Sequence, residues 1–345
     1  MKSKRLSKNI IKIFKANGFV LSEPDVLLDS EYIIERSGEK FRSSMLTFES
    51  EDGKIMCLRP DLTVASCIKF LQKKTSSKIY YSGNAYRRSS KKGTNFINDQ
   101  LGIEIFGSKN QIEDDFKVIS TILSSAIKIK KKKVHVKVAD ISLFKSLINA
   151  LDMPERWKLR LIRHFWRPIY FEELLKRLEN NTDIDQVTFD TDKRRFYEMQ
   201  KMDQSKLVAG RSISEILKRF NKKIKDPRSF SDGKRIVRII KSFLKINCKL
   251  PKLDKTLLDF IKKNNLKKNV FKDFKSIHNL NKLKQDVNFI TNFGRDVEYY
   301  TGIVFEVFSE KKEFARGGRY DDLLKSLGAK QNIPAVGAAI NLKNI

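Results

Sequence analysis

Cysteine and histidine are scarce in this 345-residue chain, which has only three of each. The cysteines are Cys57, Cys67 and Cys248, an odd number without the spacing of metal ligands, and this usage is typical of reduced thiols in a cytoplasmic protein. The histidines lie too far apart in the sequence to predict a zinc site. We therefore expect neither a metal nor a cofactor.

Long apolar runs and a secretory signal are also lacking. No apolar run approaches the roughly 18 residues that a membrane-spanning helix needs. Residues 1–19 are basic without a continuous apolar stretch, and their apolar side chains suit one face of a helix instead. A hydrophobic content of 40% in 345 residues allows a folded core and roughly two domains. The sequence therefore predicts a globular cytoplasmic protein without membrane contact.

Acidic residues are outnumbered by basic ones, and the formal net charge is +30. Such a charge is found on proteins that bind nucleic acids or other anions. It also follows from a composition rich in Lys, Asn, Ile and Phe, and the lysines are spread along the whole chain. The densest basic run, residues 128–138, begins like a solvated helix end and continues as an alternating strand. We favour the compositional explanation and expect no nucleic-acid partner.

The apolar periodicity divides the chain into three zones. Residues 1–140 mix predicted helices and strands, and strands return after residue 286. Between them, residues 141–270 carry apolar side chains at spacings of three and four, which predicts helices. We therefore predict one α+β core from residues 1–140 and 271–345, interrupted by a helical insertion region at 141–270.

The helical insertion is expected to have a small core of its own. Its predicted members are Trp157, Phe165, Trp166, Phe171, Leu174 and Leu175. The alternative is that these side chains pack on the main sheet or form a surface for a partner. Within this region Ser212 and Glu215 have the spacing of a capping box at the start of a helix.

A polar strand face is the first candidate for a binding site. Two predicted strands are joined by a hairpin loop at residues 89–95, and in the second strand Gln100, Gly102 and Glu104 alternate with apolar residues. These three residues therefore share one face of the strand. Polar groups with apolar packing behind them are typical of a binding site. An ordinary solvent-exposed sheet face would give the same pattern.

The second candidate is the stretch NFGRDVEYYTG at residues 292–302. Arg295 offers a planar pair of donors for a carboxylate, and Glu298 can accept from a cation. Tyr299 and Tyr300 offer flat walls with polar ends. This combination suits a zwitterionic ligand with a ring, such as an amino acid. Alternatively, Arg295 pairs with a neighbouring acid and only holds a turn.

The segment ARGGRYDDLL at residues 315–324 adds a glycine pair and a further arginine, Arg319. A strand-to-helix turn would also use these glycines. Together with CLRPDLT, QLGIEIFG, RDVEYYTGIVFE and IPAVGAAI, the block GGRYDDLL occurs in the order and spacing of histidyl-tRNA synthetases. The chain therefore resembles that family over nearly its whole length.

The resemblance implies a fold and a set of site residues. The fold is a class II aminoacyl-tRNA synthetase-like core, an antiparallel sheet flanked by helices, with a helical insert and without the anticodon-binding domain. The residues that match histidine-pocket positions, or lie beside them, are Asp61, Thr63, Arg87, Gln100, Glu104, Arg295, Tyr299 and Tyr300. Asp61 stands where synthetases usually have glutamate, which shortens its reach.

Departures from the synthetase pattern affect the ATP site. Arg87 is retained from the second class II motif, but the glutamate that follows in synthetases is replaced by Ser89. In the third motif, the position of the arginine that clamps the ATP phosphates is Asn344, and Lys343 can supply charge but not the planar fork. We therefore expect no catalytic residues and no aminoacylation.

Histidyl-tRNA synthetase paralogues with this anatomy serve as regulatory subunits of ATP phosphoribosyltransferase. Resemblance to them implies a partner, the short-form catalytic subunit, and a role in the first step of histidine biosynthesis. It also implies a homodimer that pairs around residues 19–30, and histidine as an effector. Three other functions remain open: a residual histidine-activating enzyme, a paralogue that binds tRNA or other RNA, and a structural scaffold whose pocket binds no ligand.

Overall fold

The computed structural model describes the chain in twelve stretches. They are residues 2–37, 44–73, 76–88, 96–130, 134–180, 186–203, 207–208, 211–224, 230–271, 277–295, 297–310 and 312–344. The hairpin loop predicted at residues 89–95 and the acid Asp296 lie outside these stretches. Within them, no helix is long and apolar enough to cross a membrane.

The chain divides into two compact units. The core unit contains Met1–Ser142, Asn247–Leu257 and Lys272–Ile345, and the helical unit contains Leu143–Ile246 and Leu258–Phe271. The bounds of the two units differ from the predicted ones at residues 141–142, at residue 271 and, over a longer segment, at Asn247–Leu257. That segment was assigned to the insertion, but β10 within it pairs antiparallel with β11 in the main sheet. Strand β10, Asn247–Lys249, has three residues, which are too few for the alternation of apolar and polar side chains to indicate a strand.

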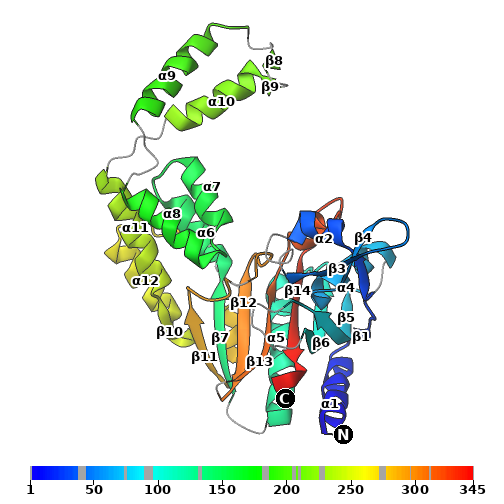
Figure 1. Ribbon diagram of the computed structural model, residues 1–345. Helices are drawn as coiled ribbons and strands as arrows, with labels where there is room; N and C mark the ends of the chain where they lie inside the picture. The colour runs from blue at the N-terminus through cyan, green and yellow to red at the C-terminus, as the bar shows by residue number, and fades with distance from the viewer. Residues whose placement is uncertain are drawn as a thin grey trace. The chain divides into compact units, whose positions relative to one another are not determined.

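The described residues of the core unit form a nine-stranded sheet in the order β1-β5-β6-β14-β13-β12-β7-β11-β10 (Figure 1). The strands are β1 (Val20–Leu21), β5 (Lys78–Tyr86), β6 (Ile97–Phe106), β7 (Val134–Asp140), β10 (Asn247–Lys249), β11 (Asp286–Ile290), β12 (Ile303–Ser309), β13 (Lys312–Arg319) and β14 (Ala335–Asn341). The pairs β1–β5 and β7–β11 are parallel, and the other six are antiparallel. The sheet is therefore mixed rather than purely antiparallel.

Smaller elements complete the core unit. A three-stranded sheet has the order β2 (Leu27–Asp29), β4 (Ile55–Leu58) and β3 (Leu46–Glu49). The helices are α1 (Lys2–Ala16), α2 (Ser30–Ser37), α4 (Leu62–Lys73), α5 (Gln111–Lys130), α13 (Leu323–Ser326), the first part of α12 (Leu253–Lys263), and the short η1 (Leu250–Lys252), η2 (His278–Lys282) and η3 (Leu342–Asn344).

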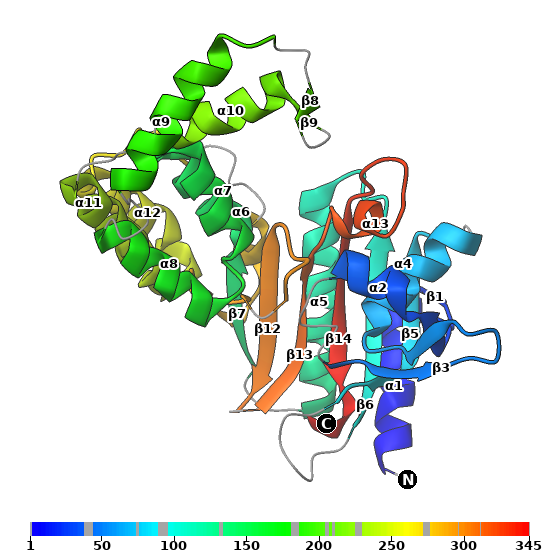
Figure 2. The same ribbon diagram turned by 45° about the horizontal axis from the view of Figure 1, so that its top comes forward.

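The two faces of the main sheet are covered differently. Helix α5 runs along one face, in contact with the central strands, and α1 packs against α5 (Figures 1 and 2). On the other face, α4 packs against β5 and β6, and α2 and α13 join it. Their buried apolar side chains, such as Val64, Ile68 and Leu324, form a core at that end. The rest of this second face holds the candidate site.

The helical unit contains α6 (Ile141–Ala150, from Leu143 on), α7 (Glu155–Arg163), α8 (Pro168–Asn180), α9 (Gln186–Gln200), α10 (Ile213–Ile224), α11 (Phe230–Leu244) and the end of α12. Five of the six predicted core residues are buried, and Trp166 is half-buried. Phe144 stacks on Phe165 at 3.8 Å between ring centroids. At the start of α10, the backbone N–H of Glu215 donates to the Ser212 hydroxyl at 3.3 Å, which is one half of the predicted capping box.

Candidate functional site

A polar cavity of about 80 Å³ opens on the second face of the main sheet, within the core unit. Its lining residues come from β6, β13 and β14, from the residues that directly follow β5 and β13, from the start of α4 and from the segment before β12: Asp61, Thr63, Arg87, Gln100, Val297, Tyr299, Tyr300, Arg316, Tyr320, Gly337, Ala338 and Ala339. A volume of this size holds several water molecules or a small polar ligand. Six of the eight predicted site residues line it.

Asp61 and Arg87 form the charged side of the cavity. Asp61 precedes the first residue of α4, and its Oδ1 accepts the backbone N–H of Val64 at 3.1 Å, so it acts as the helix N-cap. Its Oδ2 accepts from Arg87 Nη2 at 2.8 Å, and Arg87 Nε donates to the Pro60 carbonyl at 2.5 Å. Both side chains are therefore held in position before any ligand arrives.

Glu104 lies beneath the cavity and is completely buried. Its Oε1 accepts from the Thr63 hydroxyl at 2.7 Å and from the Tyr81 hydroxyl at 3.2 Å, and the Tyr320 hydroxyl donates to Oε2. Burial raises the pKa of Glu104 to about 8, although the three hydroxyl donors oppose the rise. Glu104 is not a lining residue, so it acts on the cavity through Thr63 and Tyr320.

Glycine at a lining position, Gly337, and at Gly318 beneath Tyr300 makes room for these side chains. A Cβ at Gly337 would lie 1.4 Å from Glu104 Oε2 and 2.7 Å from the Ile103 carbonyl oxygen, so no other residue fits beside Glu104. A Cβ at Gly318 would come within 2.9 Å of the Tyr300 ring. The cavity lining is therefore bare backbone beside Glu104, and Gly318 leaves space for the Tyr300 ring.

Three tyrosines form the aromatic wall. Tyr299 meets Tyr300 edge-on at 5.1 Å between centroids and meets Tyr320 edge-on at 5.8 Å. Such edge-to-face pairs are the favoured arrangement of aromatic rings. Burial raises the pKa of all three hydroxyls, so they stay protonated and can donate hydrogen bonds. Tyr320 was not among the predicted site residues.

Arg295 does not line the cavity, although the sequence offered it as the carboxylate receptor. Its side chain is buried, and its Nη1 donates to Asn292 Oδ1 at 2.7 Å, within the same segment. Of the eight predicted residues, Arg295 and Glu104 are therefore the two that the lining does not include.

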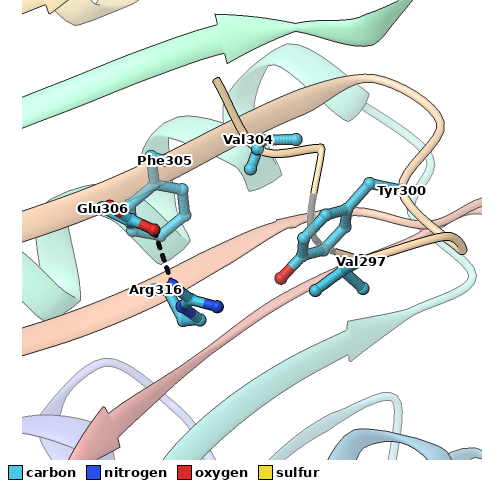
Figure 3. A pocket seen from close by; sticks show the side chains of 7 residues that line it. Val297, Tyr300, Val304, Phe305, Glu306 and Arg316 are labelled. Atoms are coloured by element: carbon cyan, nitrogen blue, oxygen red, sulfur yellow. Dashed lines mark hydrogen bonds and ion pairs between the residues drawn. The ribbon is translucent and has the colours of Figure 1, made fainter. Parts of the chain in front are cut away.

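Arg316, which the sequence reasoning missed, is the second arginine of the cavity. It also borders an adjoining hollow of about 10 Å³, together with Tyr300 and Glu306 (Figure 3). Arg316 stands opposite Ala339 in the sheet register, on the face that carries Gly102 and Glu104. In the sequence, the block at residues 315–324 indicated a glycine turn and no strand face, so nothing there singled out Arg316.

Arg319 is three residues further along β13 and therefore points to the opposite face. There its Nε and Nη2 donate to Asp115 Oδ1 of α5 at 2.9 and 2.6 Å, and its Nη1 donates to Asp321 at 2.9 Å. Both Arg319 and Asp115 are buried. This arginine joins α5 to the sheet and does not reach the cavity.

Comparison with solved structures agrees with the synthetase-like architecture. A protein from Bacillus halodurans titled ATP phosphoribosyltransferase regulatory subunit/histidyl-tRNA synthetase superposes with a TM-score of 0.59 at 16% identity, covering 99% of this chain and 77% of that one. Histidyl-tRNA synthetase from Nostoc gives a TM-score of 0.62 at 14% identity, covering 99% and 70%. The fold is that of a class II aminoacyl-tRNA synthetase core.

Sequence comparison identifies the family to which the chain belongs within this fold class. A family model described as histidyl-tRNA synthetase matches residues 1–345, and the chain belongs to the histidyl-tRNA synthetase family. Two relatives, from Mesorhizobium japonicum and Allorhizobium ampelinum, are named ATP phosphoribosyltransferase regulatory subunit. They are 28% and 29% identical to this chain, over 99% and 96% of its length and 96% and 94% of theirs.

Proposed function

We propose that this protein is a regulatory subunit of ATP phosphoribosyltransferase, acting with a separate short catalytic subunit in the first step of histidine biosynthesis. The observation that carries the proposal is the similarity, over nearly the whole chain, to relatives with that name. The polar cavity supports it, because a subunit that senses an amino acid needs a site for one. Histidine is the proposed effector, bound near Asp61, Gln100 and the tyrosine wall.

We further propose that the subunit itself is not catalytic. Asn344 replaces the arginine that clamps ATP in synthetases, and its Nδ2 donates to the Glu313 carbonyl at 2.7 Å. The ammonium group of Lys343 donates to the Ile97 carbonyl. Neither side chain provides the planar fork that arginine offers a phosphate. These contacts support a role without ATP chemistry.

Mixing the protein with the short catalytic subunit of the same organism tests the proposal. We expect formation of phosphoribosyl-ATP to rise several-fold over the catalytic subunit alone, and histidine to reduce it. The isolated protein should give no histidine-dependent ATP–pyrophosphate exchange above a blank. Exchange activity without activation of the partner would favour the histidine-activating alternative. Steeply salt-dependent RNA affinity without activation would favour the RNA-binding alternative.

We also propose that the core unit forms a homodimer around residues 19–30. Apolar side chains are exposed there on β1, an edge strand of the main sheet, and at the start of β2 and the residue before it: Val20, Leu21, Val26 and Leu27 are 41–55% exposed. Exposed edge strands and exposed apolar patches are often buried in contacts with another protein chain. Pairing of two copies would cover both.

The mass in solution distinguishes a dimer from a monomer. We expect light scattering to give a dimer for the wild type and a monomer for the double variant Leu21→Asp/Leu27→Asp. Leu159→Asp is the matched control, because Leu159 is a similarly exposed leucine in the helical unit, and this variant should stay dimeric. A monomeric wild type, or a dimeric double variant, would rule out this interface.

A further inference from the structure

Arg316 is held by two carboxylates along one edge of its guanidinium group. Its Nε donates to Glu313 Oε1 at 3.2 Å, and its Nη2 donates to Glu313 Oε2 at 2.8 Å and to Glu306 Oε1 at 2.8 Å. Because two nitrogens are fixed in this way, the plane and direction of the third are fixed too. That third nitrogen, Nη1, has no hydrogen-bond partner among the described residues.

The unengaged end of Arg316 faces the candidate site. Arg316 lines the cavity together with Asp61 and Arg87, and it lines the adjoining hollow together with Glu306. Figure 3 shows one nitrogen of Arg316 directed at Glu306 and another directed toward the side where the Tyr300 hydroxyl lies. The cavity therefore has a prepositioned cationic donor that the protein does not saturate.

A fixed guanidinium with a free donor is suited to a carboxylate. Charge-assisted hydrogen bonds from arginine are among the stronger polar contacts in proteins. Prepositioning removes part of the entropy that a flexible side chain loses when it binds a ligand. Glu306 and Glu313 together carry more charge than the single guanidinium, so a ligand carboxylate is held by the directed Nη1 hydrogen bond and not by net charge, and a highly charged anion such as a polyphosphate is disfavoured. The side chain is 39% exposed, so solvent screens the attraction and leaves it moderate.

Arg295 and Arg87 are less suited to this role. Arg295 does not line the cavity, and its Nη1 donates to Asn292. Arg87 is committed to Asp61 and to the Pro60 carbonyl on the acidic side of the cavity. An amino acid whose ammonium group lies near Asp61 would therefore direct its carboxylate toward Arg316.

We propose that Arg316 is the carboxylate-binding subsite of the cavity and selects ligands that carry an α-carboxylate. The inference rests on the proposed function, in which the cavity binds histidine. The ligand class is a small zwitterion, with its anionic group on Arg316 and its cationic group toward Asp61.

The test compares two ligands that differ only at the carboxylate. Calorimetric titrations use histidine and histidinol, in which a hydroxymethyl group replaces the carboxylate, with the wild type and with Arg316→Gln. We expect the wild type to prefer histidine, and Arg316→Gln to bind histidine about 10- to 100-fold more weakly, the range for one hydrogen bond to a charged group. Histidinol affinity should be unchanged or higher, since Glu306 and Glu313 then attract its cationic groups.

Two further variants keep the result interpretable. Arg316→Lys retains the positive charge without the planar pair of donors, so it should keep part of the preference for histidine over histidinol. This variant also tests the inference if Arg316→Gln does not fold. Arg295→Gln should leave the preference intact. The inference is overturned if Arg316→Gln weakens both ligands equally, if only Arg295→Gln removes the preference, or if the wild type binds neither ligand. Activation of the catalytic subunit is measured in a separate assay. A failure of the Arg316 inference can therefore be distinguished from a failure of the proposed regulatory function.

Discussion

An Arg319→Met variant is expected to lose about 3–5 kcal/mol of unfolding free energy, the usual cost of removing one partner of a buried ion pair. Methionine keeps most of the side-chain volume but leaves Asp115, which is 1% exposed, without its cation. Burial already raises the pKa of Asp115 to about 6 even with the arginine in place. Without the arginine the carboxyl is expected to take up a proton, so the loss should be larger at pH 8 than at pH 5.

Urea unfolding followed by circular dichroism measures this loss. The double variant Asp115→Asn/Arg319→Met should recover much of it, because no buried charge is then left unpaired. Arg238→Met, at an exposed position on α11, should change stability by less than about 0.5 kcal/mol. If the single variant at 319 matched this control, the ion pair would not be what joins α5 to the sheet.

The stability of the wild type is expected to fall between about pH 5 and pH 9 more steeply than that of Glu104→Gln. The pKa of Glu104 is raised from 4.5 to about 8 in the folded protein, so folding takes up a proton between these values. The stabilisation is fully present below about pH 4.5 and is lost as the pH rises through about 8. A shift of this size corresponds to on the order of a few kcal/mol.

Comparing the two proteins isolates Glu104 from other groups that titrate. The unfolding free energies of the two proteins are measured at pH 5, 7 and 9. Their difference should be smallest at pH 5 and largest at pH 9, where Glu104→Gln should be the more stable protein. The glutamine amide cannot ionise but has nearly the same shape beside Gly337. Parallel pH profiles would show that Glu104 keeps an ordinary pKa.

The sequence predicted the strand that carries Glu104 but not its environment. Alternation correctly put Gln100 and Glu104 on one strand face. It could not show that hydroxyls from Thr63, Tyr81 and Tyr320 converge on Glu104, because they come from positions 23 to 216 residues away. The sequence therefore left a binding site and an open polar surface as alternatives for this face, whereas Glu104 is completely buried.

Arg316 and Arg319 on β13 and Arg295 before β12 also show that the sequence does not reveal the surroundings of a side chain. The block resemblance directed attention to Arg295 and Arg319, yet Arg316 is the one that lines the cavity. Which face an arginine occupies depends on strand register, and the register follows from pairing with β12 and β14. Local composition alone does not contain that information.

The glycine at position 337 of the cavity lining limits how mutations can change the space for a ligand. Any substitution at Gly337 adds atoms beside Glu104, so a single change there can only reduce the space for a ligand. Space for a larger ligand can therefore come only from changes in other lining side chains, such as Tyr299, Tyr300 or Arg316. One mutation at Gly337 is therefore enough to abolish ligand binding, whereas a broader range of ligands requires changes in the side chains that form the walls.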